Sequence, residues 1–244
     1  MSVYFKSDVG KRRPNNEDNG GYIYNQKNQL LTVVCDGVGG EKSGEVASQL
    51  VVKSLKEAFE PTQFNTIEEA KSFIINIVKD VNHTIYERAQ TELENERMGT
   101  TMVVAIIIGQ QALILNVGDS RAYLYRDEHM NQLTEDHSYV NELMRTGEIT
   151  KEEAEVHPQK NYITRSMGLD KDVEVDEWTI DLHDAKWLLL CSDGLTNMLN
   201  DQIIEHILAN TSSDEWTEAL VHSANEAGGR DNITVLIVDQ HEWR

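Results

Sequence analysis

The sequence predicts an α+β fold in which antiparallel β-sheets are covered by helices. Apolar, β-branched segments follow one another in runs, whereas long amphipathic segments stand in separate blocks. This order lacks the regular strand–helix alternation that is typical of a parallel sheet. The 244 residues, 39% of them hydrophobic, suffice for one well-buried core, so we expect residues 1–244 to form a single domain.

Continuous apolar or β-branched composition predicts the strands. The segments concerned are 22–24, 30–35, 101–108, 112–117, 122–125, 187–191 and 233–238. Gly109 and Gln110 separate two of these segments, and a Gly-X pair between strands favours a type II′ hairpin. We therefore expect neighbouring strands to pair antiparallel.

Helical periodicity predicts longer helices over 43–60, 66–95 and 212–226. Pro61 follows the first of them, and proline cannot continue a helix. The other two begin with capping boxes, which pair Thr66 with Glu69 and Ser212 with Glu215.

A polar stretch from about 134 to 172 interrupts the strands. Thr150 and Glu153 form another capping box within it, and Gly147 and Pro158 break its helical pattern. We expect this stretch to be an inserted flap with short helices, less well packed than the sheets.

The charge balance limits the classes of partner. The 22 Lys and Arg residues stand against 42 Asp and Glu, a formal net charge of −20. This argues against binding to nucleic acids and to anionic membranes. There is no apolar stretch of about 18 residues and no secretory signal pattern at the N-terminus, so we expect a cytoplasmic protein.

The two cysteines, Cys35 and Cys191, do not form a disulfide framework or a zinc set. Each ends an apolar segment, where a buried reduced thiol is usual. Neither is followed by arginine six positions later, the spacing that would hold a phosphate over a cysteine nucleophile. A thiol-based phosphatase is therefore not indicated.

Residues 33–45, VVCDGVGGEKSGE, could be a nucleotide-binding loop or could present Asp36 itself. A P-loop needs Gly-Lys-Ser or Gly-Lys-Thr at the end of its glycine run. Here Glu41 separates Gly40 from Lys42, and a carboxylate there would repel a phosphate. The dinucleotide pattern also fails, because its third glycine would have to be Lys42. Asp36 is the better candidate for the working residue.

Asp36 belongs to a set of aspartates at strand ends. Asp119 and Asp193 also follow apolar strands, Asp231 precedes one, and Asp18 lies just before the segment 22–24. If these strands lie side by side, the carboxylates face one another and need cations to neutralise them. Oxygen ligands of this kind suit Mg²⁺ or Mn²⁺, and shared carboxylates can hold two ions for phosphoryl chemistry.

Two other interpretations of these aspartates are a turn and a calcium site. Asp-Gly after a strand is ordinary turn chemistry, so the metal hypothesis depends on the whole set and not on any one pair. Calcium is a rival ion, but an EF-hand concentrates its ligands within twelve residues, and the sequence has no such loop.

Seven short motifs resemble those of bacterial type 2C protein phosphatases, the metal-dependent serine/threonine phosphatase family. They are RPNNED at 13–18, CDGVGG at 35–40, MGTT at 98–101, VGDSR at 117–121, DHS at 136–138, CSDGL at 191–195 and GRDNIT at 229–234. They occur in family order over nearly the whole chain. The resemblance implies a sandwich of two antiparallel β-sheets flanked by helices, in four αββα layers, with metals at one edge.

The resemblance also implies roles for individual residues. Asp36 would bridge two Mn²⁺ or Mg²⁺ ions, and the carbonyl of Gly37 would bind the second. Asp193 and Asp231 would complete the first site, and Asp119 with Asp193 would hold a third ion. Arg13 would clamp the substrate phosphate, because a guanidinium can make two charge-assisted bonds. Outer-shell positions fall to Glu17, Asp18 and Asn232, and the catalytic set is Arg13, Asp36 and Asp193.

The implied reaction is removal of phosphate from phosphoserine and phosphothreonine in proteins by a metal-bridging hydroxide, without a phospho-enzyme. Partners would be phosphoprotein substrates and a cognate Ser/Thr kinase, and we expect a monomer. Val38 stands where many eukaryotic members carry a histidine proposed as general acid, so we expect a metal-bound water in that role and a structural one for His137. Alternatives are a pseudophosphatase that binds phosphoproteins without turnover, and a metal-dependent nuclease or nucleotide phosphatase.

Overall fold

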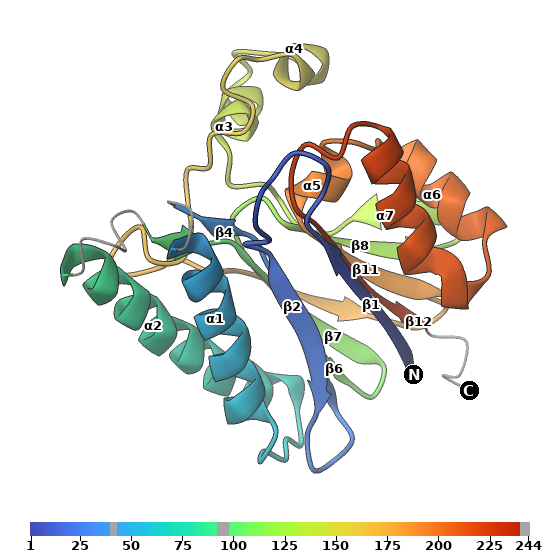
Figure 1. The fold of residues 1–244 in the computed structure, drawn as a ribbon. Helices are drawn as coiled ribbons and strands as arrows, with labels where there is room; N and C mark the ends of the chain where they lie inside the picture. Colours follow the sequence, from blue (N-terminus) through green and yellow to red (C-terminus); the bar gives the residue numbers. More distant parts are fainter. Residues whose placement is uncertain (40–42, 92–97, 240–244) are drawn as a thin grey trace.

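Two five-stranded antiparallel sheets form the centre of the molecule (Figure 1). The protein is seen here as a computed structural model that describes residues 1–39, 43–91 and 98–239. The sheet we call the β12 sheet has the order β1 (Ser2–Asp8), β12 (Ile233–Asp239), β11 (Trp187–Cys191), β8 (Arg121–Arg126), β9 (His129–Gln132). The β3 sheet has the order β10 (Asp176–Asp181), β7 (Gln111–Val117), β6 (Met102–Ile108), β3 (Leu30–Cys35), β2 (Asn19–Tyr24). A small pair, β4 (Gly37–Val38) with β5 (Gly99–Thr100), extends from it.

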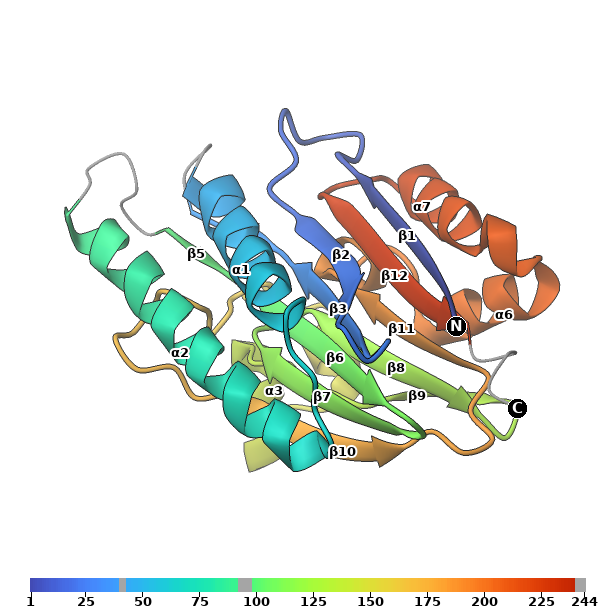
Figure 2. The ribbon, with the colours of Figure 1, turned by 90° about the horizontal axis from the view of Figure 1, so that it is seen from below.

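Helices cover the outer face of each sheet. The helices α1 (Ser43–Phe59) and α2 (Ile67–Thr91) pack on the β3 sheet. On the β12 sheet lie α5 (Asp193–Thr196), α6 (Asp201–Asn210), the 3₁₀ turn η2 (Ser213–Glu215) and α7 (Trp216–Glu226). Figure 2 shows the two groups of helices on opposite sides of the sheets. This order of layers confirms the predicted fold class.

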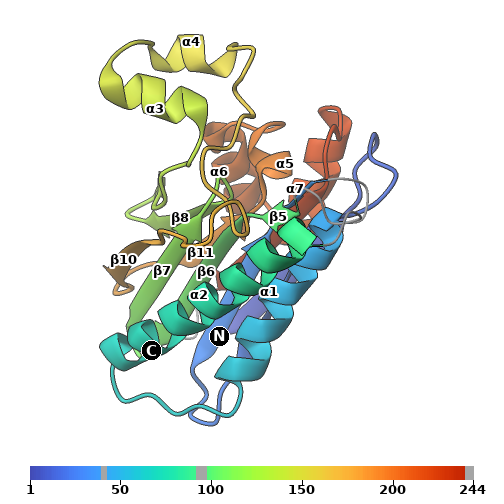
Figure 3. The ribbon, with the colours of Figure 1, turned by 90° about the vertical axis from the view of Figure 1, so that its left-hand side faces the viewer.

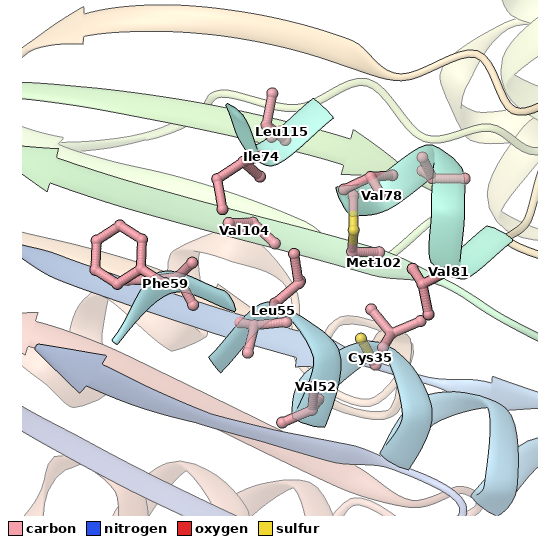
Figure 4. Packing of buried hydrophobic residues seen from close by; sticks show 14 of the residues in the cluster. Cys35, Val52, Leu55, Phe59, Ile74, Val78, Val81, Met102, Val104 and Leu115 are labelled. Atoms are coloured by element: carbon pink, nitrogen blue, oxygen red, sulfur yellow. The ribbon is translucent and has the colours of Figure 1, made fainter. Parts of the chain in front are cut away.

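The continuous apolar strands are explained by burial of both sheet faces. Side chains in β3 alternate, so Leu31, Val33 and Cys35 pack toward α1 and α2. Leu30 and Val34 point to the opposite face and join the core between the two sheets. Figure 4 shows the first of these clusters, in which Cys35 lies with Leu55 and Val81. Both cysteines are buried free thiols, as predicted.

The polar stretch predicted as a flap lies between β9 and β10 and carries α3 (Tyr139–Thr146) and α4 (Lys151–Glu155). Both helices stand away from the sheets (Figure 3). The capping box of Thr150 with Glu153 is present at the start of α4, and Gly147 ends α3 in a left-handed conformation with φ of 77°. The predicted short helices are confirmed.

The element boundaries differ from the prediction where local signals were weak. Strands β1, β9 and β10 and helix α6 were not predicted; β1 is only partly buried, so it lacks a continuous apolar run. The predicted helix 212–226 begins with a 3₁₀ turn, and the capping box predicted there is wrong: Ser212 Oγ donates to the Glu215 side chain and accepts no backbone N–H. Residues 92–95 of the predicted second helix, and Gly40, Glu41 and Lys42 of the glycine-rich loop, lie outside the described residues.

Within the ranges given above, no helix is long and apolar enough to cross a membrane.

Candidate functional site

The sheet topology brings the predicted aspartates to one rim of the sandwich. Asp36 follows β3 and Asp119 follows β7, and these two strands run in the same direction because each is antiparallel to β6 between them. Asp193 follows β11 and Asp231 precedes its antiparallel neighbour β12, so both lie at one end of the β12 sheet. Asp18 precedes β2, which is antiparallel to β3, and therefore lies beside Asp36.

A hydrogen bond joins the two sheets at this rim. Ser192 Oγ donates to Asp18 Oδ2 at 2.6 Å. Ser192 Oγ also accepts the Thr234 backbone N–H at 3.0 Å. Asp18 is thereby held from the β12 sheet although its own strand belongs to the β3 sheet. Asp18 and Asp119 are buried, whereas Asp36, Asp193 and Asp231 remain partly exposed.

Burial and mutual repulsion perturb the rim carboxyls. Burial, with the charges of Asp18, Asp193 and Asp119 beside it, raises the pKa of Asp36 well above its ordinary value. Burial likewise raises the pKa of Asp119, with Asp193 as the nearest like charge, and the pKa of Asp193, with Asp231 beside it. The pKa of Asp18 rises to about 7 for the same reason. Without a cation, these groups resist ionisation at neutral pH.

The donor set fits divalent cations. Among the described residues, Asp18, Asp119 and Asp193 each have a buried Oδ1 without a hydrogen-bond partner. Such oxygens call for a ligand. No three described His, Cys, Asp or Glu side chains already stand at the spacing of a complete metal-ligand set. Mg²⁺ and similar ions keep several waters and need only one or two direct carboxylates, so an open rim of this kind suits them.

Arg13 lies at the rim and is paired with a predicted ligand. Its NH2 group donates to Asp231 Oδ2 at 2.7 Å, and this bond raises the pKa of the guanidinium. About half of the Arg13 side chain is exposed, with a relative accessibility of 49%. In this arrangement Arg13 supplies positive charge to the carboxylates, with Asp36 and Glu17 as further acidic neighbours.

A hollow of about 250 Å³ opens beside the aspartates and is lined by Arg13, Pro14, Asn15, Glu17, Gly39 and Asn232. Asn232 shapes it: its Oδ1 accepts the Glu17 N–H at 2.8 Å, and its Nδ2 donates to the carbonyls of Val9 and Asn15. Asn232 therefore fixes the loop that carries Arg13. A larger hollow of about 380 Å³ lies elsewhere, between α2 and residues 171–173, and contains none of the rim aspartates.

Close backbone contact accounts for the glycine after Asp193. A Cβ at Gly194 would lie 1.8 Å from the Asn232 carbonyl oxygen, a distance that no side chain can adopt. This contact holds the first turn of α5, which begins at Asp193, against the residue that follows Asp231. Glycine is thus required at position 194 by this close packing, which places the predicted ligands Asp193 and Asp231 near each other.

The side chains of Val38 and His137 are not available as proton donors in this structure. Val38 ends the short strand β4 and has no ionisable group. His137 Nδ1 accepts the Gly118 N–H at 2.9 Å, and its Nε2 faces Asp176 at 3.2 Å. The prediction of a structural histidine is confirmed. Gly37, the predicted carbonyl ligand, pairs with Thr100 in the strand pair β4–β5.

The motifs also contain residues whose contacts the sequence does not indicate. Arg121 makes a two-pronged ion pair with Asp136, from Nε to Oδ1 at 2.9 Å and from NH2 to Oδ2 at 2.6 Å, which ties β8 to the start of the flap. Thr100 and Thr101 hold the backbone of Asp36. The signal was their place in short motifs next to the aspartates; only the tertiary structure shows what they contact.

The geometry has close parallels among known proteins. The sequence model of the family described as "Protein phosphatase 2C" matches residues 11–235. The serine/threonine phosphatase stp of Listeria welshimeri is 44% identical over 243 residues, which cover 99% of this chain and 96% of the relative. The protein phosphatase PhpP of Streptococcus pneumoniae is 41% identical over 99% of this chain and 98% of its own length.

A solved structure has the same fold. The crystal structure of the serine/threonine phosphatase Stp1 from Staphylococcus aureus superposes with a TM-score of 0.94 at 42% identity. The match covers 98% of this chain and 94% of that one. Both sheets and the flanking helices are therefore common to the two proteins.

Proposed function

Because this chain belongs to the protein phosphatase 2C family and is a protein serine/threonine phosphatase, we propose that its rim aspartates hold the divalent ions that the reaction requires. The family is generally metal-dependent. The observation that carries the proposal is the group of rim carboxyls whose pKa values are raised. Three of them, Asp18, Asp119 and Asp193, keep a buried oxygen without a hydrogen bond.

In this proposal Asp36, whose carboxyl has the other four rim aspartates as neighbouring charges, would help to hold two Mn²⁺ or Mg²⁺ ions. The Gly37 carbonyl would complete one site, and Asp193 with Asp231 the other. Asp119 and Asp193 would hold a third ion. Glu17, Asp18 and Asn232 would act from the outer shell: Asn232 and Glu17 by fixing the Arg13 loop, and Asp18 through its bond to Ser192.

When bound, such ions activate water as a nucleophile and neutralise charge on the phosphoryl group. Arg13, which lines the hollow beside the aspartates, would bind the substrate phosphate. Its guanidinium is already desolvated in part and held by Asp231, so little reorganisation is needed when a phosphate takes that place. In this proposal neither Val38 nor His137 protonates the leaving oxygen. The Val38 side chain has no ionisable group, and both ring nitrogens of His137 are engaged, by Gly118 and by Asp176.

Phosphoprotein substrates follow from the serine/threonine phosphatase activity. We further propose a cognate Ser/Thr kinase that forms these substrates, a cytoplasmic location and a monomeric state. The net charge of −20 supports the choice of protein over nucleic acid, because an acidic surface repels a polyanion.

The test is hydrolysis of phosphoserine, phosphothreonine and phosphotyrosine peptides of one sequence, with Mn²⁺ and with a chelator. We expect Mn²⁺-dependent release of phosphate from the first two and little from the third. Mononucleotides are the matched comparison for the nucleotide phosphatase alternative. Equal rates on mononucleotides, or full activity in the chelator, would contradict the proposal, and absence of any turnover would favour a phosphoprotein-binding role.

A further inference from the structure

Thr100, which ends β5, and Thr101, which precedes β6, together bond to both backbone groups of Asp36. Thr101 Oγ1 accepts the Asp36 N–H at 2.9 Å. The Asp36 carbonyl accepts the Thr101 N–H at 2.8 Å and the Thr100 hydroxyl at 2.9 Å. Since β4 and β5 pair just beyond this point, the turn that carries the Asp36 carboxylate is fixed by one short segment.

Thr101 also contacts the loop that carries Asp119. Its Oγ1 lies 2.7 Å from Ser120 Oγ, and Ser120 directly follows Asp119. Because Thr101 Oγ1 accepts from Asp36, its own hydrogen remains available to donate to Ser120. Thr101 and Ser120 are both fully buried, so water does not compete for these bonds. One hydroxyl therefore connects the Asp36 loop with the Asp119 loop.

The methyl group of Thr101 adds a packing contact to this connection. Gly118, with φ of +109°, has no Cβ, and a Cβ there would lie 2.6 Å from Thr101 Cγ2. Thr101 stands at the start of β6, the strand between β3 and β7, so the two loops flank it on either side. The hydroxyl thus contacts both loops, and the methyl group packs against the Asp119 loop.

We propose that Thr101 is a positioning residue whose hydroxyl fixes the Asp36 and Asp119 carboxylates relative to each other and thereby sets the affinity of the rim for divalent ions. The inference rests on the proposed assignment of both aspartates as metal ligands. Residues that hold metal ligands in place commonly change metal affinity about 10- to 100-fold when they are replaced.

The decisive comparison is Thr101→Val with Thr101→Ser. Valine keeps the shape and removes the hydroxyl, whereas serine keeps the hydroxyl and removes the methyl. Thr32→Val is the matched control, because Thr32 is also fully buried in the β3–β6 pair and donates to the Ala105 carbonyl at 3.3 Å, away from the rim. Mn²⁺ binding is measured by calorimetry without substrate, and folding by circular dichroism in a chelator.

We expect Thr101→Val to lower Mn²⁺ affinity about 10- to 100-fold, while Thr101→Ser and Thr32→Val stay close to the parent. A folded Thr101→Val protein that binds Mn²⁺ as Thr32→Val does would overturn the inference. If Thr101→Val does not fold, Ser120→Ala decides: it removes the second half of the connection but leaves Asp36 its acceptor, and parent-like affinity in that variant would equally overturn the inference.

Asp36→Asn separates this inference from the function on which it rests. If Asp36→Asn loses Mn²⁺ while Thr101→Val retains it, only the positioning role fails. If Asp36→Asn binds as many ions as the parent, the ligand assignment itself fails.

Discussion

Three of the rim aspartates, Asp36, Asp119 and Asp193, are unfavourable without a cation. Their carboxyl groups are withdrawn from water and face like charges, and their pKa values are raised as a result. Buried charges of one sign persist in a fold when a cation compensates for them. In this structure Arg13 supplies part of that compensation through Asp231.

Burial of the Asp18 carboxyl makes the free energy of unfolding depend on pH. Its pKa is about 7 in the folded protein, against 3.8 for an unperturbed carboxyl. Between these values the folded state holds a proton that the unfolded chain has released, so the metal-free parent loses stability as pH rises from about 4 to about 7. The slope from this group is at most about 1.4 kcal/mol per pH unit.

Asp18→Asn removes this titration and keeps an oxygen that can accept from Ser192 Oγ. We expect the stability of the parent relative to Asp18→Asn to fall between pH 5 and pH 7. Urea unfolding of both proteins in a chelator measures the difference. A constant difference over this range would show that Asp18 is ionised throughout.

Arg13 is expected to act mainly in substrate binding. Arg13→Ala should raise KM more than it lowers kcat, because the guanidinium contacts the phosphate in the ground state. Arg13→Lys should rescue only part of the loss, since an amine cannot reproduce the two-pronged geometry. Arg12→Ala is the control from the same exposed basic stretch. Steady-state kinetics on a phosphothreonine peptide checks this, and an unchanged KM in Arg13→Ala would reassign the residue to a solvated cluster.

At the scale of elements, the aspartates could be predicted because strand ends are visible in the sequence. Runs such as 30–35 and 187–191 are apolar on both faces, and each ends where the strand in the structure ends. The partners of Asp36 could not be predicted, because Thr101 lies 65 positions away and contacts Asp36 only after β6 pairs with β3. The Arg13–Asp231 pair spans 218 positions for the same reason.

The loop after β7 links Asp119 to the flap. Gly118 donates to His137 Nδ1 at 2.9 Å and its carbonyl accepts the His137 N–H at 3.0 Å, and His137 stands at the start of the flap. If an ion held by Asp119 orders this loop, Asp119→Ala should bind one ion fewer than the parent at high Mn²⁺ and lose most activity on phosphopeptides. Because the loop is bonded to the flap, the flap should then be more exposed to protease. Asp80→Ala, an exposed aspartate of α2, is the control.

Metal counting, peptide turnover and limited proteolysis test this prediction together. A parent-like ion count with normal turnover in Asp119→Ala would make Asp119 a turn residue and nothing more.

At the scale of the whole molecule, the site exists because the two sheets meet at one rim. The first and last strands, β1 and β12, pair along their whole length, which brings Asp8 opposite Ile233 and places the 9–17 loop beside Asp231. The hydrophobic pattern predicts that strands exist but does not determine their order within a sheet, because buried strands with two apolar faces are interchangeable by pattern alone. The order of the strands is therefore seen only in the structure.

The central claim, that the rim carboxylates bind divalent ions, makes opposite predictions for the metal-free and the metal-bound protein. The most direct measurement is the thermal unfolding of the parent and of Asp36→Asn, each in a chelator and at saturating Mn²⁺. In the chelator the variant should be the more stable, because the amide is uncharged without taking up a proton, whereas the raised pKa of Asp36 makes burial of that carboxyl costly at neutral pH. Mn²⁺ at 100 times its dissociation constant should stabilise the parent by about 2.7 kcal/mol for each site and the variant by much less, so that their order reverses. An equal Mn²⁺-dependent shift in both proteins would contradict the claim.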